Sequence, residues 1–257
     1  MGVPTFYTRL LDEPGLTHES TATMRLFVSG SAPLLAETHR AFESRTGHPI
    51  LERYGMTETN MNTSNPYNGA RVPGTVGFAL PGVSVRIVDP DSGVAMPEGE
   101  VGMIEVKGPN VFKGYWNMPE KTAAEFRSDG YFITGDLGRF DSHGYLQIVG
   151  RGKDLIISGG LNIYPKEVED AIDALPGVIE SAVIGLPHAD FGEGVVAVIV
   201  PHKGKAPTEA EILNGLKDKL ARFKQPKHIA FVDELPRNTM GKVQKNILRE
   251  QFKHIQF

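Results

Sequence analysis

MRLFVSGSAPLLAETHRAFESRTGHPILERY, residues 24–54, is the stretch that decides how the first part of this chain folds. The apolar run 24–29 stops at a glycine and predicts a short buried strand. Residues 33–46 predict a helix, because apolar side chains recur at helical spacing and Pro33 suits a first turn. Residues 49–54 return as a strand. This order predicts parallel pairing through a right-handed crossover, which makes this part of the chain α/β.

Downstream, the pattern changes to short runs of alternating polar and apolar residues. Turn sequences such as DPDSG, PEGE and DSHG separate the runs. Alternation of this kind predicts a small antiparallel β-barrel or sheet over about 75–150. The four runs are 83–88, 102–107, 131–137 and 145–149, and the segment PEKTAAEF between two of them predicts a short helix.

The pattern changes a third time toward the C-terminus, where we expect an α+β module. Its expected helices are 164–175, 208–221 and 245–252, and its expected strands are 178–186, 194–201 and 227–232. The sequence TEAE at Thr208 is a capping box, which predicts the start of a helix. Glycines flank charged residues at 150–154, so we place a domain boundary there. Residues 1–150 would then be the end of a large parallel-sheet domain with the barrel as a subdomain, and 151–257 a small C-terminal domain.

The composition excludes several classes of protein. The chain has 257 residues, a net charge of −4 and no cysteine. Without cysteine there is no disulfide framework, thiolate nucleophile or cysteine zinc site. The weak negative charge gives no reason to expect nucleic acid or a membrane as partner. No apolar stretch is long enough to span a bilayer and the first residues lack the layout of a signal peptide, so we expect a cytoplasmic protein.

Two turns follow the predicted parallel strands, at the strand ends where open α/β sheets bind ligands. In SGSAPL, Gly30 permits close approach of a planar or anionic ligand. In ERYGMTET, Tyr54 could stack on a base and Thr57 could bind a phosphate. Glu58 could hold Mg²⁺, which prefers carboxylate and phosphate oxygens. The alternative is structural: a plain strand-to-helix turn and a surface loop with a core tyrosine.

Three further segments place a polar residue beside glycine. In YFITGD, Asp136 could accept both hydroxyls of a ribose or stand in an ordinary turn. In GRGKDLIISGG, Arg151 can reach a ribose or phosphate oxygen, and Gly159 with Gly160 leaves backbone uncovered for a narrow channel. In PRNTMGK, Lys242 could neutralise charge that develops on a phosphate, or could simply be solvated.

Taken in order, YGMTE, YFITGD, GRGKDLIISGGLNIYP and PRNTMGK resemble the motifs of the adenylate-forming superfamily at family spacing. Its members are acyl-CoA synthetases, nonribosomal adenylation domains and luciferases. The matches run from Ser29 to Lys242 and so span nearly the whole chain. ERYGMTETNMNTSNPY and VPTFYTRLL are most similar to the malonyl-CoA synthetases among these members.

The resemblance implies a two-step ligase reaction that uses ATP, Mg²⁺ and coenzyme A. A carboxylate attacks the α-phosphate of ATP, which gives an acyl-adenylate and pyrophosphate. The mobile C-terminal domain then rotates about a hinge near Lys153, and CoA displaces AMP. Lys242 is the implied catalytic residue, because it stabilises charge during adenylation.

The resemblance also assigns binding residues. The implied ATP-binding and AMP-binding residues are Gly30, Ser31, Ala32, Glu52, Arg53, Tyr54, Gly55, Met56, Thr57, Asp136, Arg151 and Lys242. Glu58 is the implied Mg²⁺ ligand. The CoA channel would be lined by Ser158, Gly159 and Gly160.

One departure from the family pattern concerns the phosphate loop. Nothing in the chain resembles its sequence, SSGTTGxPK, which lies upstream of SGSAPL in complete members. We therefore expect the chain to be a C-terminal portion that acts only together with a missing N-terminal segment carrying that loop.

The acid substrate is expected to be malonate or methylmalonate, whose second carboxylate needs a cation or several donors. Arg9 in FYTRLL is the candidate for this contact, with Met61 beside the same substrate, although a helix-surface arginine would look the same. Three alternatives stay open: a ligase for another small carboxylate, an adenylation domain that loads a carrier protein, and a non-catalytic nucleotide-binding relic. Because acetylation removes a lysine charge, Lys242 is also a candidate target of a lysine acetyltransferase and deacetylase.

Overall fold

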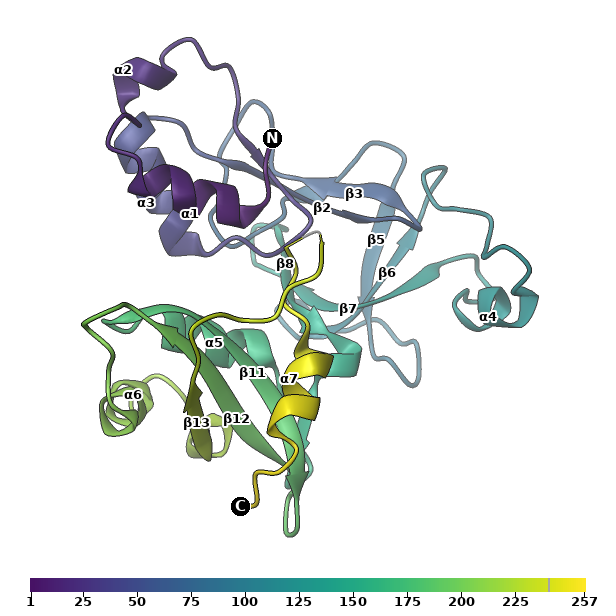
Figure 1. Ribbon diagram of the computed structural model, residues 1–257. Helices are drawn as coiled ribbons and strands as arrows, with labels where there is room; N and C mark the ends of the chain where they lie inside the picture. The colour runs from purple at the N-terminus through teal and green to yellow at the C-terminus, as the bar shows by residue number, and fades with distance from the viewer. Residues whose placement is uncertain (240) are drawn as a thin grey trace. The chain divides into compact units, whose positions relative to one another are not determined.

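The structure is a computed structural model that describes residues 1–239 and 241–257. The chain forms two compact units, Met1–Ile148 and Val149–Phe257, each with its own hydrophobic core (Figure 1). The range 150–154, where we expected a domain boundary, lies at the start of the second unit. A hinge at Lys153 stays a prediction.

The predicted strand–helix–strand arrangement is present in the first unit. β1 (Val28–Ser29) pairs with β2 (Leu51–Met56) in parallel, and α3 (Ala36–Thr46) connects them. α3 begins later than predicted, because Leu35 keeps an extended backbone at the N-cap. It ends where Gly47 adopts the left-handed conformation with φ of 75°. β1 is shorter than the apolar run that predicted it.

Four elements that the sequence analysis did not predict complete this part. They are α1 (Pro4–Asp12), α2 (His18–Thr21), β3 (Asn60–Ser64) and β4 (Phe78–Ala79). The sheet has the order β1-β2-β3-β4, with antiparallel pairs from β2 onward. Its core contains Tyr7, Leu16, Leu34, Phe42 and Ile50. Burial raises the pKa of Tyr7 to about 12, and its hydroxyl donates to the Val28 carbonyl oxygen at 2.7 Å.

The second sheet of this unit has the order β5-β6-β7-β8. The strands are β5 (Ser84–Val88), β6 (Gly102–Lys107), β7 (Phe132–Phe140) and β8 (Leu146–Arg151), and α4 (Pro119–Ala124) lies in the predicted helical segment. The pairs β5–β6 and β6–β7 are antiparallel, as predicted. The expected β-barrel is not found: β5 and β8 are the end strands, and no pairing joins them in the described residues. Four short strands are too few to curl into a closed barrel.

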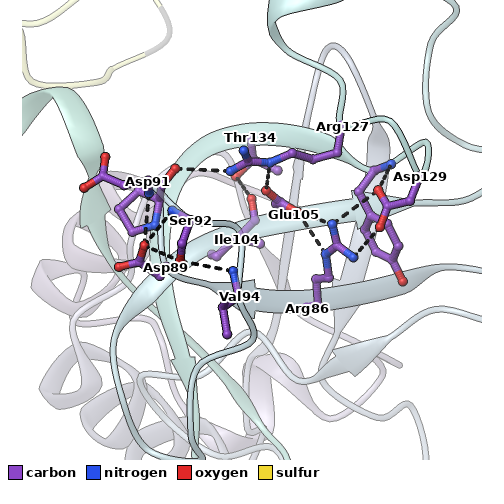
Figure 2. A network of polar contacts seen from close by, with 12 residues as sticks. Arg86, Asp89, Asp91, Ser92, Val94, Ile104, Glu105, Arg127, Asp129 and Thr134 are labelled. Atoms are coloured by element: carbon purple, nitrogen blue, oxygen red, sulfur yellow. Dashed lines mark hydrogen bonds and ion pairs between the residues drawn. The ribbon is translucent and has the colours of Figure 1, made fainter.

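A network of charged side chains lies on this sheet (Figure 2). Glu105 of β6 is fully buried, and it binds Arg86 Nη2 and Arg127 Nε, each at 2.7 Å. Arg86 also binds Asp129 at 2.6 Å and lies 3.8 Å from the centroid of the Tyr131 ring. The hydrogen bond from Arg86 holds the pKa of Asp129 below its usual range. Two guanidinium groups therefore balance the one buried carboxylate.

The second unit is a five-stranded sheet with helices on both faces. Its strands are β9 (Ile156–Ser158), β10 (Leu161–Ile163), β11 (Val178–His188), β12 (Gly192–Pro201) and β13 (His228–Phe231). The order is β10-β9-β12-β11, and β13 pairs with β12 in parallel. The core on one face includes residues of α5 (Pro165–Asp173) and α6 (Glu209–Leu216), and the core on the other includes α7 (Lys245–Phe252) (Figure 1). β11 and β12 are near-continuous apolar runs because both of their faces are covered.

α6 confirms the predicted capping box. The Glu211 amide donates to Thr208 Oγ1 at 3.3 Å, and the Thr208 amide donates to Glu211 Oε2 at 2.7 Å. The helix ends before the predicted Ala221. Gly215 in its last turn weakens the helix, and Leu175 leaves no room there for a Cβ. In the part of the chain that the structure describes, no helix combines the length and apolar character needed to cross a membrane.

Candidate active site

The carboxyl ends of β1 and β2 bring two predicted segments together. Ser29 is paired with Glu52, and a Cβ on Gly30 would lie 3.4 Å from Arg53 Cγ. In the turn 30–32, Ser31 has φ of 71°, a conformation that costs a non-glycine residue about 1–3 kcal/mol. Strain of this kind is concentrated at ligand sites. The turn is therefore a candidate contact for a ligand, in the place where ATP and AMP binding was predicted.

Tyr54 and Asp136, which were predicted from separate motifs, meet in the structure. The Tyr54 hydroxyl donates to Asp136 Oδ2 at 2.6 Å. Tyr54 belongs to β2 and Asp136 to β7, so this hydrogen bond links the two sheets of the first unit. Asp136 is only 4% exposed. The pair places a ring and a carboxylate side by side, as recognition of a base and a ribose diol requires.

A β-bulge directs Asp136 toward Tyr54. Residues 134–136 of β7 lie opposite the single residue Ile104 of β6. Gly135 has φ of 73°, which a side chain would disfavour. Thr134 Oγ1 donates to the Ile104 carbonyl at 2.8 Å and accepts the Asp136 amide at 3.1 Å. Bulges of this kind re-aim side chains next to functional sites.

The glycine of YGMTE has a structural reason. A Cβ on Gly55 would lie 1.9 Å from the Asn60 carbonyl oxygen, so β2 and β3 approach each other closely there. Met56 pairs with Asn60 at the end of this hairpin, and Thr57 follows as an exposed residue of the turn. Met61 is paired with Gly55 and is half-buried. Gly55 therefore fixes the turn that presents Thr57.

Glu52 supports the core of the fold. It is 6% exposed, and its Oε1 lies 3.0 Å from Nδ1 of the fully buried His39. His39 Nε2 accepts the Ile50 amide at 3.2 Å, so Nδ1 carries the proton and donates to Glu52. One oxygen of this carboxylate is thus used by the fold, which the motif alone could not reveal.

Glu58 lies beside a phenol and a second carboxylate. The Tyr115 hydroxyl oxygen is 2.6 Å from Glu125 Oε2 and 3.2 Å from Glu58 Oε1. A hydroxyl has one proton, so it cannot donate to both carboxylates at once. Burial and the hydrogen bond to Glu125 raise the pKa of Tyr115 above its usual range. Lys121 Nζ lies 4.2 Å from the centroid of the Tyr115 ring.

The surroundings of Glu58 fit one hard cation. Mg²⁺ usually takes one or two protein carboxylates and completes its shell with water and substrate phosphates. Glu58 is half-buried and forms no ion pair with any described residue. Within residues 1–239 and 241–257, no three His, Cys, Asp or Glu side chains are grouped as a metal site. Glu58 would therefore hold Mg²⁺ only with the phosphates of a nucleotide.

Arg9, the predicted contact for the second carboxylate of the substrate, is an exposed residue of α1. It lies in the last turn of α1 with an exposed side chain, and no hydrogen bond or ion pair to a described residue fixes it. Met61, by contrast, packs against Gly55, because its Cε lies 2.9 Å from where a Cβ would stand. The structure brings Met61 to the β2–β3 turn, and the role of Arg9 stays a prediction.

The predicted hinge lies in a short 3₁₀ turn, η1 (Gly152–Asp154), directly after Arg151 at the end of β8. Lys153 is exposed. Asp154 binds Arg249 of α7 at 2.9 Å. The residue after Lys153 is therefore anchored to the second unit.

Ser158 ends β9, and Gly159 with Gly160 forms the turn between β9 and β10. The two glycines have φ of 59° and 77°. A Cβ on Gly159 would lie 3.3 Å from Phe191, whereas nothing lies within 4 Å of a Cβ on Gly160. Ser158 is 5% exposed. Open backbone at Gly160 agrees with the predicted CoA channel, which stays a prediction.

Lys242 lies in a turn whose backbone is fixed by Asn238. Asn238 Oδ1 accepts the Lys242 amide at 3.0 Å, and the Asn238 amide donates to the Lys242 carbonyl at 2.9 Å. Gly241 has φ of 76°. Lys242 is half-buried, and no described residue forms an ion pair with it. A fixed lysine whose charge is not matched within the described chain is available to an anionic ligand.

Two family models match this chain. The AMP-binding enzyme model matches residues 1–116, and the AMP-binding enzyme C-terminal domain model matches residues 167–242. This chain belongs to the AMP-binding enzyme family. The matched ranges include the turns of Ser31, Glu58 and Lys242.

The chain is similar to proteins of about twice its length. It is 69% identical to ATP-bound MatB from Rhodopseudomonas palustris, with a TM-score of 0.97, over 99% of this chain and 50% of that chain. It is 41% identical to a malonate–CoA ligase of Arabidopsis thaliana, over 98% of this chain and 44% of the relative. It is also 41% identical to a long-chain-fatty-acid–CoA ligase of Bacillus subtilis (strain 168), over 97% and 45%. The chain thus spans about half the length of the curated relatives it matches.

Three residues near the predicted motifs were not found by sequence reasoning. Tyr115 and Glu125 lie far from Glu58 in sequence, and only the fold brings them together. Arg237 lies inside PRNTMGK itself, but the motif does not show what its guanidinium binds. The aromatic sequence FKGYW was the one available signal for Tyr115.

Proposed function

We propose that this chain supplies the AMP-binding and thioester-forming part of an ATP-dependent acid–CoA ligase that uses malonate. The observation that carries the proposal is the hydrogen bond between Tyr54 and Asp136, because it joins an aromatic ring of β2 to a carboxylate of β7. The likeness to ATP-bound MatB supports a nucleotide at this place, and the likeness to malonate–CoA ligases supports the acid.

The proposed first step forms malonyl-AMP. A carboxylate oxygen of malonate bonds to the α-phosphorus of ATP, and the bond from that phosphorus to pyrophosphate breaks. Lys242 stabilises the negative charge that develops on the α-phosphate, as a preorganised cation does. Glu58 would hold Mg²⁺, which would neutralise phosphate charge when bound.

The proposed second step forms the thioester. The thiolate of CoA attacks the acyl carbonyl of malonyl-AMP, and AMP leaves with the electron pair of the broken carbon–oxygen bond. Asp136 holds the ribose in both steps, with Arg151 as a further contact. CoA reaches the carbonyl past Ser158, Gly159 and Gly160 after the second unit has turned about Lys153. Motions of this kind exchange catalytic groups at one site.

The proposed enzyme includes a segment equivalent to the remaining half of the relatives. That segment would supply the phosphate loop, which is a cradle of backbone amides for the phosphates of ATP. Assays therefore need the full-length protein that contains these 257 residues.

Malonate-dependent exchange of labelled pyrophosphate into ATP tests the first step. We expect exchange with malonate and, in the presence of CoA, formation of malonyl-CoA with release of AMP. The acid is tested with malonate, methylmalonate, acetate and a long-chain fatty acid, because a long-chain ligase and a malonate ligase match the chain at the same 41% identity. No exchange with any acid would contradict the proposal and leave a nucleotide-binding relic.

Carrier-protein loading is the second candidate function. It shares the first step, so pyrophosphate exchange does not separate it from the ligase. CoA-dependent release of AMP does: a carrier-loading enzyme would exchange pyrophosphate but would release no AMP on addition of CoA.

A further inference from the structure

The turn that carries Lys242 is braced from one side by Arg237. Arg237 and Val243 form an isolated antiparallel bridge, and the Gln244 amide donates to the Pro236 carbonyl at 2.8 Å. Inside this bridge, the Gly241 amide donates to the Asn238 carbonyl at 2.9 Å. Hydrogen bonds therefore fix the backbone of Asn238, Gly241 and Lys242.

The guanidinium group of Arg237 has two partners. Nη1 donates to the Gly241 carbonyl oxygen at 2.7 Å, and Nη2 forms an ion pair with Glu180 Oε2. Glu180 belongs to β11, a long strand of the central sheet of this unit. One planar, rigid group thus links the residue before Lys242 to the sheet.

A second ion pair anchors the other end of the turn. Lys245, the first residue of α7, binds Glu169 of α5 at 2.6 Å. Glu169 Oε1 also accepts the Val183 amide of β11 at 2.8 Å. Arg237 is therefore held by β11, and Lys245 is held by α5.

A purely stabilising role does not explain the Arg237 brace. Its two charged side chains are 29% and 30% exposed, and partly exposed ion pairs add little to stability. The hydrogen bond to Gly241, however, fixes the carbonyl of a residue at φ of 76°, in a turn that has no side chain there to limit its motion. The brace therefore fixes the carbonyl group of the residue directly before Lys242.

We propose that Arg237 is a positioning residue for Lys242 and that Glu180 orients Arg237. The inference rests on the proposed function, in which Lys242 acts in adenylation and not in thioester formation. Misplacing a reacting group by about 1 Å can cost about 10²-fold in rate. Loss of the brace should therefore slow adenylation and leave the thioester step unchanged.

The test uses the full-length protein and both half-reactions. Pyrophosphate exchange with malonate measures adenylation, and CoA-dependent AMP release from added malonyl-AMP measures thioester formation. We expect Arg237→Ala to slow exchange by about 10–10²-fold without slowing the second reaction. Glu180→Gln removes the ion pair with Arg237 but leaves the hydrogen bond from Arg237 to Gly241. It should therefore slow exchange less than Arg237→Ala does. Lys253→Ala, which breaks the exposed pair with Glu250, is the matched control and should change neither reaction.

The Lys242→Ala background separates positioning from general damage. If Arg237 acts through Lys242, then Arg237→Ala has no further effect on exchange once Lys242 is already alanine. Equal slowing of both half-reactions, or an undiminished effect in the Lys242→Ala background, would overturn the inference. If Arg237→Ala does not fold, Arg237→Lys replaces it in the test. It keeps the positive charge but loses the two guanidinium nitrogens that bind Gly241 and Glu180, so exchange should again slow without a change in the second reaction. Absence of exchange in the wild-type protein would instead contradict the proposed function.

Discussion

Glu105 and Glu58 are two carboxylates of the same unit in opposite electrostatic surroundings. Glu105 is fully buried between Arg86 and Arg127 (Figure 2). Glu58 is half-buried and shares a single phenol, Tyr115, with a second carboxylate. The first charge is neutralised by two arginines, whereas no described residue forms an ion pair with the second.

The difference indicates which charges serve the fold and which serve a ligand. Buried charges in a fold are paired, because an unpaired one is expensive to desolvate. Glu58 and Glu125 share only the hydroxyl proton of Tyr115, and Glu58 forms no ion pair with a described residue. Their negative charges would therefore repel each other until a cation binds. Lys242 is the complementary case in the second unit: its backbone is fixed, and no described residue neutralises its charge.

The largest effect on stability should come from Glu105→Gln. It leaves two arginines without their shared carboxylate, which should lower the free energy of unfolding by about 3 kcal/mol. Chemical denaturation measures this change, with the exposed Glu98→Gln as control. Activity per folded molecule should not change. A loss of stability no greater than that of the control would remove the distinction between Glu105 and Glu58.

Glu58→Gln should show the opposite behaviour. Adenylation should fall by about 10²-fold, because the proposed Mg²⁺ ligand is lost, while stability stays the same or rises as repulsion from Glu125 is relieved. Pyrophosphate exchange over a range of Mg²⁺ concentrations measures the effect. An unchanged Mg²⁺ dependence would show that Glu58 does not bind the ion.

Tyr115→Phe should sharpen this contrast with a smaller change. Without the hydroxyl, Glu58 and Glu125 lose their common partner, and a residue that orients a metal ligand is worth about 10-fold in affinity. The Mg²⁺ concentration for half-maximal exchange should rise. The exposed Tyr67→Phe is the control, and an equal response of the two variants would count against an orienting role for Tyr115.

Asp173 is a third kind of carboxylate, one whose charged form burial disfavours. Burial raises the pKa of Asp173 from 3.8 to about 7, and the Ser181 hydroxyl, which donates at 2.7 Å, opposes the shift. Between these two pKa values the folded state binds more protons than the unfolded state, so stability falls as pH rises, by at most about 1.4 kcal/mol per pH unit. Asp173→Asn should flatten the dependence between pH 5 and 7, and the exposed Asp218→Asn should not. Identical pH profiles of wild type and Asp173→Asn would refute this.

Much of the fold followed from the sequence, because its patterns are local. The parallel pairing of β1 with β2, the antiparallel runs, and the helices α5 and α7 come from periodicity and from turn residues. The barrel did not follow, since closure depends on which distant strands pair and alternation along one strand says nothing about this. The short strand β3 was missed because its residues, NMNTS, have no β pattern until β2 stands beside them.

Only the residues of the candidate site that lie in sequence motifs could be predicted. Tyr54 and Asp136 were expected at one ligand, and the structure joins them by a hydrogen bond. The partners that distinguish one charge from another, such as Tyr115 for Glu58 and Arg237 for the Lys242 turn, lie far apart in sequence or bind backbone atoms. No residue pattern records such contacts.

The measurement that tests the central claim most directly compares wild type and Lys242→Ala in the full-length protein, one half-reaction at a time. The account predicts that Lys242→Ala lowers malonate-dependent pyrophosphate exchange by about 10²–10³-fold and leaves CoA-dependent AMP release from added malonyl-AMP at the wild-type rate. Equal losses in the two half-reactions, or exchange at the wild-type rate, would contradict it.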